Sequence, residues 1–345
     1  MNNITLLIHG PYGDNILELI YKNLSKSKLK VNKIIFVIYK FEKEKYLKVI
    51  NLFKNYNIET VFIKDLINPG FANVNRQIYS VNEGLKLCED KDFVVKLRND
   101  QCVNFIKLFN IIKKYKLFLD TEDKKVLTTC SFSRKDRLYH PSDMFLCAYG
   151  KALKNYYKIN LQKYTELDTK LRIRKLYEES NKTLKFNPIS AESILFKNYI
   201  INNGWIIKNT QEDSHKAIKE FIYIINTWNI DLIWSKKRTN MFGKNAIILP
   251  HYFTTAPFQG APIEKHECYL QHEIFKTIPT LKDIFYINLS KFVWFMWTNN
   301  NDGLFMNLEE YDSKNISFLE RIFSIFRNEN RLIINILFFR IVLKI

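Results

Sequence analysis

Short apolar runs alternate with longer segments of helical periodicity over the first 130 residues of the chain. The apolar runs predict strands, and they cover residues 4–9, 33–38, 60–63, 93–97 and 125–130. The periodic segments between them predict helices at residues 15–24, 42–56, 74–87 and 103–115. Strands without a polar face are typical of a parallel sheet that helices cover on both faces. The pattern therefore predicts an α/β fold with a mostly parallel sheet.

After residue 130 strand and helix no longer alternate. Residues 140–150 predict a turn and a further strand, and a charged stretch of helical pattern follows at 160–182. The next helix has Ser190 as its expected N-cap and Gly204 as its expected stop. These elements extend the sheet domain by one strand and two helices.

The chain divides into three parts by pattern. Residues 1–210 predict the α/β domain, and residues 211–315, where periodicity gives little, predict a C-terminal helical subdomain packed on it. Residues 316–345 are apolar, with five basic and two acidic residues between the apolar ones, and predict a basic amphipathic helix. Two interpretations of that helix are open. It lies on an anionic membrane surface, or it docks on the protein's own core or on a second subunit.

The formal net charge is +18, from 53 basic and 35 acidic residues, so anionic partners are expected. Nucleic acid, an anionic membrane and phosphorylated small molecules share that chemistry, and a solvated basic surface would need no partner. No block of five like charges is present, which argues against a nucleic-acid-binding arm. The five cysteines form no CxxC pair and indicate reduced thiols in a cytosolic protein. No apolar stretch reaches the ~18 residues of a membrane-spanning helix.

Two loops after predicted strands have ligand-binding chemistry. His9, Gly10 and Tyr12 follow the first strand, where a glycine lets the backbone approach a ligand and the next helix offers free N–H groups. Asn73 and Arg76 lie at the start of a predicted helix and are suited to a base, a sugar hydroxyl or a phosphate. The alternative is that both loops hold ordinary turn and capping residues.

A third candidate site lies at the end of the fourth predicted strand. Arg98 and Asp100 are two residues apart and would share one face of an extended chain. An aspartate beside a pyrophosphate holds Mg²⁺ or Mn²⁺, whereas an arginine can neutralise the phosphates itself through paired hydrogen bonds. A surface ion pair without function is the alternative.

Two carboxylates are candidates for a catalytic base. Asp143 and Glu192 both have apolar neighbours, and burial among them would raise the pKa of each and make it a better base near neutral pH. His140 stands three residues before Asp143, where it could orient that carboxylate or bind phosphate. A helix cap or a solvated acid is the alternative for each carboxylate alone.

These motifs, in this order, resemble the WavE-type lipopolysaccharide-synthesis proteins over residues 4–205. The resemblance includes a Gly-Pro after the first strand, an Asn-Arg-Gln-Ile helix start, a Lys-Leu-Arg-x-Asp strand end, and a Ser-Asp followed by an aromatic residue and a glycine. In this chain they are Gly10-Pro11, Asn75 to Ile78, Lys96 to Asp100, and Ser142, Asp143, Phe145 and Gly150. The resemblance implies a bacterial glycosyltransferase with a GT-A-like, Rossmann-type sheet and helices on both faces.

The broader GT-A pattern agrees in one element and departs in another. Glu192, Gly204 and Trp205 resemble the acidic helix that is followed by a glycine and an aromatic residue. Arg98, however, stands where such enzymes have the first acid of an Asp-x-Asp metal motif. The resemblance therefore implies either a divalent metal, Mn²⁺ or Mg²⁺, at Asp100, or neutralisation of the leaving group by arginine and lysine without a metal.

The resemblance implies transfer of a sugar from a nucleotide-sugar donor to a growing cell-surface glycan, either lipopolysaccharide core or capsule. The acceptor would be a glycan or a lipid-linked glycan, with the subdomain on the acceptor side. The protein would be cytoplasmic and peripheral at the inner membrane. In the donor site, the base or ribose would meet His9, Gly10 and Tyr12, and the pyrophosphate would meet Arg76 and Arg98. Asp143, with Glu192 next, would deprotonate the acceptor hydroxyl.

Two other functions stay open. A metal-independent sialyltransferase-like enzyme would use His140 or another histidine as its base and would stay active in EDTA. A non-catalytic scaffold of glycan assembly would have the same sequence features. Nucleic-acid binding is less favoured, because it gives no reason for the arrangement of Arg98, Asp100 and Asp143, and we expect no nucleic-acid partner.

Overall fold

The computed structural model describes residues 3–12, 16–135, 137–165, 167–168, 190–234 and 268–287, and the backbone of three strands within 323–344. The chain forms two compact units. The first comprises residues 1–233 and 255–278, and the second comprises residues 234–254 and 279–345. Each unit is described by itself.

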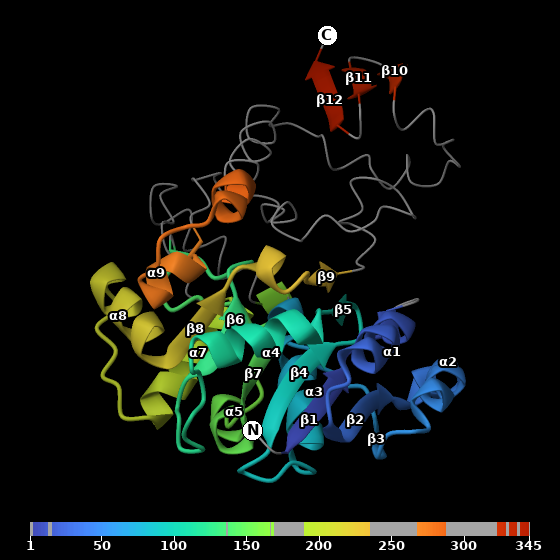
Figure 1. The fold of residues 1–345 in the computed structure, drawn as a ribbon, viewed down its shortest axis with the longest axis vertical. Helices are drawn as coiled ribbons and strands as arrows, with labels where there is room; N and C mark the ends of the chain where they lie inside the picture. Colours follow the sequence, from blue (N-terminus) through green and yellow to red (C-terminus); the bar gives the residue numbers. More distant parts are fainter. Residues whose placement is uncertain are drawn as a thin grey trace. The chain divides into compact units, whose positions relative to one another are not determined.

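A seven-stranded sheet forms the centre of the first unit (Figure 1). Its order is β3 (Ile58–Ile63), β2 (Val31–Tyr39), β1 (Ile4–His9), β4 (Phe93–Arg98), β7 (Leu146–Tyr149), β6 (Val126–Thr129) and β8 (Ile222–Ile225). All neighbouring pairs are parallel except those of β7, which runs antiparallel to β4 and to β6. The side chains of β1, β4, β6 and β7 are buried almost throughout. The predicted mostly parallel sheet is confirmed.

Two layers of helices enclose this sheet (Figure 1). α1 (Ile16–Ser27) and α4 (Phe105–Lys114) contact each other, and α3 (Val74–Leu85), α5 (Gly150–Tyr156) and α7 (Ala191–Asn202) form a contiguous set. The short α2 (Lys43–Ile50) follows β2, and α8 (Gln211–Phe221) leads into β8. Gly84 of α3 lies so close to the sheet that a Cβ there would be 2.2 Å from Leu7 Cδ1. The face of β1 that carries Leu7 is therefore the face that α3 covers.

Gly150, at the start of α5, is also fixed by a close approach. A Cβ there would lie 2.1 Å from the carbonyl oxygen of Glu89, and Gly150 N donates to Asp92 O at 2.8 Å. Gly150→Ala is therefore expected to lower the free energy of unfolding by about 1–3 kcal/mol, as overpacking does. Urea unfolding measures this, with exposed Lys151→Ala as a control that stays within about 0.5 kcal/mol of the wild type. An unchanged midpoint for Gly150→Ala would contradict the prediction.

The sequence had indicated that the sheet domain ends at residue 210, but the sheet includes residues beyond that position. β8 pairs in parallel with β6, with Ile225 opposite Thr129, so α8 and β8 belong to the sheet. β8 has only four residues and follows Phe221 of α8 directly, so its pattern cannot be told from the end of the helix. Most of the charged stretch at 160–182 and most of the predicted subdomain at 211–315 lie outside the described residues.

The C-terminal segment is not the predicted amphipathic helix of residues 316–345. β10 (Phe323–Asn328), β11 (Arg331–Ile336) and β12 (Phe339–Lys344) form an antiparallel three-stranded sheet. The pairs Asn328–Arg331 and Ile336–Phe339 close its two hairpins. β-Branched residues favour strands and are frequent here: Ile325, Ile333, Ile334, Ile336, Ile341 and Val342. The membrane-surface helix therefore has no structural basis in residues 323–344.

Candidate functional site

The carboxyl ends of β1 and β4 bring the first candidate residues together. β1 and β4 are parallel, and His9 lies opposite Arg98 in their register. Asn99 N donates to His9 O at 2.8 Å, which extends the pairing beyond the strands. Ligands of open α/β sheets bind at this carboxyl edge. Two residues that the resemblance assigns to the donor site therefore lie at the same end of the sheet.

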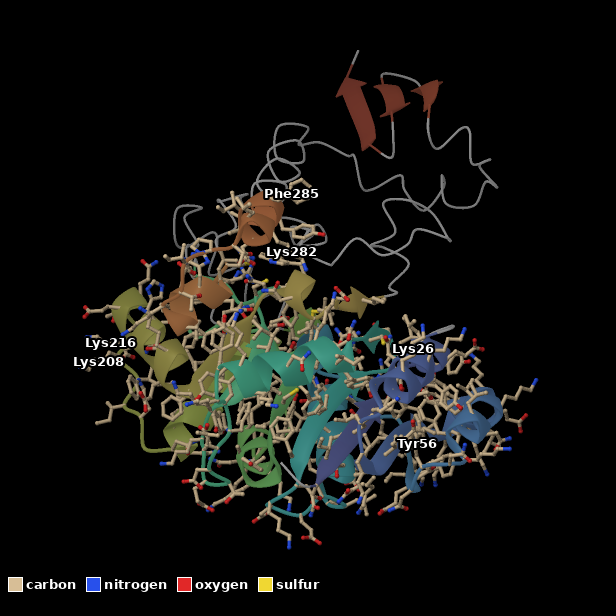
Figure 2. The ribbon with its side chains drawn as sticks, in the orientation of Figure 1. Lys26, Tyr56, Lys208, Lys216, Lys282 and Phe285 are labelled. Atoms are coloured by element: carbon tan, nitrogen blue, oxygen red, sulfur yellow. The ribbon has the colours of Figure 1, made fainter. Side chains whose placement is uncertain are left out.

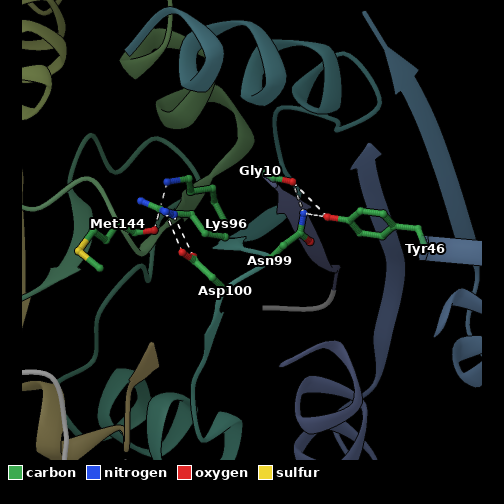
Figure 3. A network of polar contacts seen from close by, with 7 residues as sticks. Gly10, Tyr46, Lys96, Asn99, Asp100 and Met144 are labelled. Atoms are coloured by element: carbon green, nitrogen blue, oxygen red, sulfur yellow. Dashed lines mark hydrogen bonds and ion pairs between the residues drawn. The ribbon is translucent and has the colours of Figure 1, made fainter. Parts of the chain in front are cut away.

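Arg98 and Asp100 form the ion pair that the sequence allowed. Arg98 Nε donates to Asp100 Oδ1 at 3.0 Å, and Arg98 Nη2 donates to Asp100 Oδ2 at 2.8 Å (Figure 3). Only 23% of the Arg98 side chain and 10% of the Asp100 side chain are exposed. β4 ends at Arg98 and the chain turns, so the two side chains meet in a turn and not along a strand. A pair buried to this degree is not the solvated surface pair of the alternative interpretation.

His9 is a buried histidine at this edge. Its Nδ1 lies 2.9 Å from Ser80 Oγ, and that hydroxyl lies 3.2 Å from Gln77 O. The Ser80 hydroxyl can donate or accept, so either ring nitrogen of a neutral His9 can carry the proton. Burial, with the nearby charges of Lys96 and Arg98, holds the pKa of His9 well below its ordinary value. The Nε2 atom is buried and has no hydrogen-bond partner.

The loop after β1 is fixed by the chain around it (Figure 3). Gly10 has φ +99°, a conformation that favours glycine, and its carbonyl accepts from Asn99 Nδ2 at 2.5 Å and from Tyr46 Oη at 3.1 Å. Tyr12 N donates to Glu42 Oε1 at 3.1 Å, and the Tyr12 ring packs edge-on against Tyr46 at 5.0 Å between centroids. Gly10 and Tyr12 are thus presented by a preformed loop.

Asp143 is buried and lies next to a buried lysine of β4. Lys96 Nζ donates to Asp143 O at 2.6 Å. It also donates to Met144 O at 3.2 Å (Figure 3). Burial raises the pKa of the Asp143 carboxyl, and the charge of Glu192 adds to this, while Lys96 and Arg98 oppose it. Burial also lowers the pKa of Lys96 to about 7. Asp143, Lys96, Arg98 and Glu192 therefore form one electrostatically linked cluster.

Glu192 and His140 lie together beside this cluster. Ser190 caps α7, and its Oγ accepts from Ser193 N at 3.2 Å, which places Glu192 in the first turn. Glu192 Oε2 is 3.6 Å from His140 Nε2. His140 Nδ1 donates to Phe132 O at 2.9 Å. Burial, together with the charges of two nearby arginines, lowers the pKa of His140 to about 3, and burial raises the pKa of Glu192.

Asn73 and Arg76 form a second cluster, beyond the end of β3. Arg76 Nε donates to Asp65 Oδ1 at 2.7 Å, and Arg76 Nη1 donates to Asn73 Oδ1 at 2.9 Å. The Arg76–Asp65 ion pair is about one-third exposed on each side. The contacts of Arg76 are thus with Asp65 and Asn73, and its place at the pyrophosphate stays a prediction.

Among the described residues no divalent-metal site forms at Asp100, and metal binding there stays a prediction. Both carboxylate oxygens accept hydrogen bonds from Arg98, whose guanidinium therefore stands where a cation would bind. In the described part of the chain, no group of three or more His, Cys, Asp or Glu residues is placed to hold a metal ion. Mn²⁺ and Mg²⁺ prefer several oxygen ligands, of which Asp100 alone supplies too few.

Buried polar atoms without a partner concentrate at this edge of the sheet. Within the described residues there are twelve such atoms, and seven of them border the carboxyl edge. The seven are His9 Nε2, Glu42 Oε2, Asn99 Oδ1, Gln101 Nε2 and Oε1, Thr129 Oγ1 and Ser142 Oγ. Unsatisfied buried polar atoms are rare in folded proteins and need an explanation such as water or a ligand. Their concentration indicates that a polar ligand or ordered water completes this edge.

Sequence reasoning assigned no role to Lys96, Gln77 or Glu42. The signal for Lys96 was present, because a lysine interrupts an otherwise apolar strand. Gln77 donates through Nε2 to Tyr157 Oη at 3.1 Å and to Asp143 O at 3.4 Å, contacts that no local pattern reveals. Glu42 follows β2 at the start of a segment that was predicted only as a helix.

The positive charge outside this edge is spread over the surface. Lys26 on α1, Lys208 before α8 and Lys216 on α8 are exposed and extend outward (Figure 2). This distribution fits the interpretation of a solvated basic surface. Among the residues that the structure describes, no helix has both the length and the apolar character needed to cross a bilayer.

Comparison with known proteins gives a family. The family described as WavE lipopolysaccharide synthesis matches residues 60–230, which hold β4, α3, β7 and α7. No curated protein matches the chain.

Solved structures with a related arrangement share little sequence with the chain. The 4-diphosphocytidyl-2C-methyl-D-erythritol synthase of Anaerococcus prevotii is 15% identical, with a TM-score of 0.31 over 59% of this chain and 95% of that one. HddC of Yersinia pseudotuberculosis is 13% identical, with a TM-score of 0.31 over 48% and 87%. TarS of S. aureus is 12% identical, with a TM-score of 0.34 over 59% and 34%. Similarity of this extent gives no argument about what the chain binds.

Proposed function

Because residues 60–230 belong to the WavE lipopolysaccharide synthesis family, we propose that the chain is a glycosyltransferase of cell-surface glycan assembly. It would transfer a sugar from a nucleotide-sugar donor to a lipopolysaccharide core or capsule glycan. One observation supports this most: at the carboxyl edge of the sheet, the Arg98 guanidinium acts on the buried acid Asp143, and Glu192, which is partly exposed, lies close enough to act on it too. A sugar nucleotide needs a cation for its phosphates, and the transfer needs a base.

The donor would lie across the ends of β1 and β4. The base and ribose end would meet His9, Gly10 and Tyr12, where His9 Nε2, which has no hydrogen-bond partner in the structure, would bind a polar group of the donor. The pyrophosphate would meet Arg98, whose guanidinium forms paired hydrogen bonds with phosphate oxygens as it does with Asp100. Asn73 and Arg76, in the second cluster, would reach the donor only from the side of β3.

Asp143 is the proposed base for the acceptor hydroxyl. Its burial raises its pKa toward the working range, which improves proton abstraction near neutral pH. Glu192 has the same property and is the second choice. His140 is a weak base, because a pKa of about 3 leaves little driving force for taking a proton. This low pKa also counts against the sialyltransferase-like alternative with His140 as base.

A metal-independent reaction is favoured by one specific observation. The Arg98 guanidinium binds both oxygens of Asp100, so it would stabilise the departing diphosphate in place of a metal ion. Retention of activity in EDTA is therefore expected. The non-catalytic scaffold alternative predicts no nucleotide-sugar binding at all.

A thermal-shift screen of the full chain tests the proposal. The protein is melted with UDP-, GDP-, CMP- and dTDP-sugars, each with Mn²⁺ and with EDTA. A ligand that binds only the folded state raises its stability with the logarithm of concentration over Kd. We expect one nucleotide to raise Tm and the shift to survive EDTA. A shift lost in EDTA would assign a metal to Asp100, and no shift with any nucleotide would count against the glycosyltransferase.

Peripheral association with the cytoplasmic face of the inner membrane stays part of the proposal. Its support is the family's link to lipopolysaccharide synthesis and the net charge of +18, not the C-terminal segment, whose described residues form strands. The acceptor would be a lipid-linked glycan, and no nucleic-acid partner is proposed.

A further inference from the structure

Lys96 is a charged residue inside the sheet. It lies on β4, its side chain is fully buried, and its Nζ donates to two consecutive carbonyls, Asp143 O at 2.6 Å and Met144 O at 3.2 Å (Figure 3). Burial of an ammonium group is costly unless it is paired or hydrogen-bonded. An apolar residue would fill the same space at lower cost. The position of the ammonium therefore calls for a role beyond packing.

The segment that enters β7 is held by side chains from three elements. Lys96 of β4 and Gln77 of α3 both donate to Asp143 O, and Lys96 also donates to Met144 O. Thr128 of β6 donates through Oγ1 to Ser142 O at 2.9 Å and to Phe145 O at 2.8 Å. Four consecutive carbonyls, those of residues 142–145, thus accept from side chains. Only the donor from β4 can carry a charge.

The charge of Lys96 affects the pKa of Asp143, and several other charged groups lie near both residues. On its own strand end, Arg98 and Asp100 lie nearby with opposite signs, and His9 on β1 is neutral. From the segment before β7, the Asp143 carboxylate attracts the ammonium. The Glu192 carboxylate on α7 repels that of Asp143. Loss of the ammonium would leave Gln77 and Thr128 to hold the backbone, and would leave Asp143 with one fewer cation.

We propose that Lys96 is a positioning residue for Asp143, which it anchors to the end of β4 and keeps ionised beside Glu192. This inference rests on the proposed function in one respect, namely the role of Asp143 as the base. Lys96 itself contacts protein carbonyls and acts on the reaction through Asp143.

The test measures the ionisation of Asp143 directly. The protein is labelled with ¹³C at the aspartate carboxyl carbon, and Asp143→Asn assigns the signal. Lys96→Met is expected to raise the pKa of Asp143 by about one unit or more, because removal of a nearby cation disfavours the carboxylate. Lys96→Arg, which keeps the charge, should shift it less. An unchanged pKa of Asp143 in folded Lys96→Met overturns the proposal.

Lys33→Met is the matched control. Lys33 is also a lysine of the central sheet whose Nζ donates to a backbone carbonyl, that of Leu87 at 2.9 Å, and it pairs with Glu59. It lies on β2 near the opposite end of the strands, so its removal should leave the titration of Asp143 unchanged. An equal shift in Lys33→Met would show a general effect of net charge and would overturn the specific role of Lys96.

A reciprocal measurement covers the case in which Lys96→Met does not fold. The interaction of two titrating groups is mutual, so removal of the Asp143 charge must lower the pKa of Lys96. ¹⁵N NMR of lysine Nζ, assigned with Lys96→Arg, compares the wild type with Asp143→Asn. A lower pKa of Lys96 in Asp143→Asn supports the proposal, and an unchanged pKa overturns it.

The kinetic counterpart separates this inference from the proposed function. If the wild type transfers sugar, the acidic limb of its pH–rate profile should move to higher pH in Lys96→Met by the same amount as the pKa of Asp143. An unmoved limb would show that Asp143 is not the base, even if the titrations agree. If the wild type binds and transfers no nucleotide sugar, the proposed function fails, and the two titrations still decide the effect of Lys96 on Asp143.

Discussion

Replacement of Asp143 by Asn is expected to lower the rate of sugar transfer by about 10²–10⁴-fold, the usual contribution of a general base. Asn has the same shape and keeps the backbone carbonyl that Lys96 and Gln77 bind, so the fold and the position of the side chain should be retained. What is lost is the ability to take a proton. Steady-state transfer rates at saturating donor measure the effect, and Kd for the donor should change little.

The pH profile gives the same prediction independently. A base is active when it is ionised, so wild-type activity should fall as the pH is lowered through the pKa of Asp143. Burial and the charge of Glu192 raise that pKa, so the acidic limb should lie above the ordinary range of an aspartate. Glu192→Gln is the matched comparison at the second candidate base. Full loss in Glu192→Gln with activity retained in Asp143→Asn would assign the base to Glu192.

Replacement of Arg98 by Met is expected to weaken donor binding by about 10- to 100-fold, the loss of one charge-assisted contact with phosphate. Two effects add in this variant. The guanidinium no longer meets the diphosphate, and the Asp100 carboxylate, only 10% exposed, is left without its partner and repels the phosphates. Arg98→Lys keeps the charge but not the paired geometry and should lie between Met and the wild type. Isothermal titration with the nucleotide that stabilises the wild type measures Kd.

Two further variants separate the causes. If the repulsion by Asp100 dominates, the double variant Arg98→Met/Asp100→Asn should recover most of the affinity. If the lost phosphate contact dominates, it should not. Arg76→Met tests the second cluster, whose ion pair with Asp65 is partly exposed and contributes little to stability. If Arg76→Met loses as much donor affinity as Arg98→Met, both arginines bind the diphosphate. If Arg98→Met binds the donor as tightly as the wild type, Arg98 is not part of the donor site.

The sequence was informative where the physical constraint is local and strong. Parallel strands that are buried on both faces must be apolar at almost every position. The continuous apolar runs at β1, β2 and β4 could therefore be recognised as strands from the sequence. The order of the strands was not predicted, so the proximity of His9 to Arg98 is known only from the pairing of β1 with β4. The buried state of Asp143 followed from its apolar neighbours.

Other features depend on contacts that a local pattern does not contain. The apolar C-terminal segment with spaced arginines fits a helix or strands almost equally, and pairing between β10, β11 and β12 decides for strands. The role of Lys96 depends on carbonyls 47 and 48 residues away. The pairing of Arg98 with Asp100 was foreseen as one alternative, but its burial depends on the surrounding chain.

The reversed direction of β7 has a consequence for how such a protein can diversify. Since β7 is antiparallel to β4 and β6, the segment that enters it begins at the edge where the parallel strands end. The proposed base thus arrives on a connection of its own, separate from the turns after β1 and β4 that would hold the donor. Insertions or exchanges between β6 and residue 141 can therefore reshape the acceptor side while the donor side stays intact. Because β7 is antiparallel, the segment that carries the proposed base can change in sequence separately from the turns that would hold the donor.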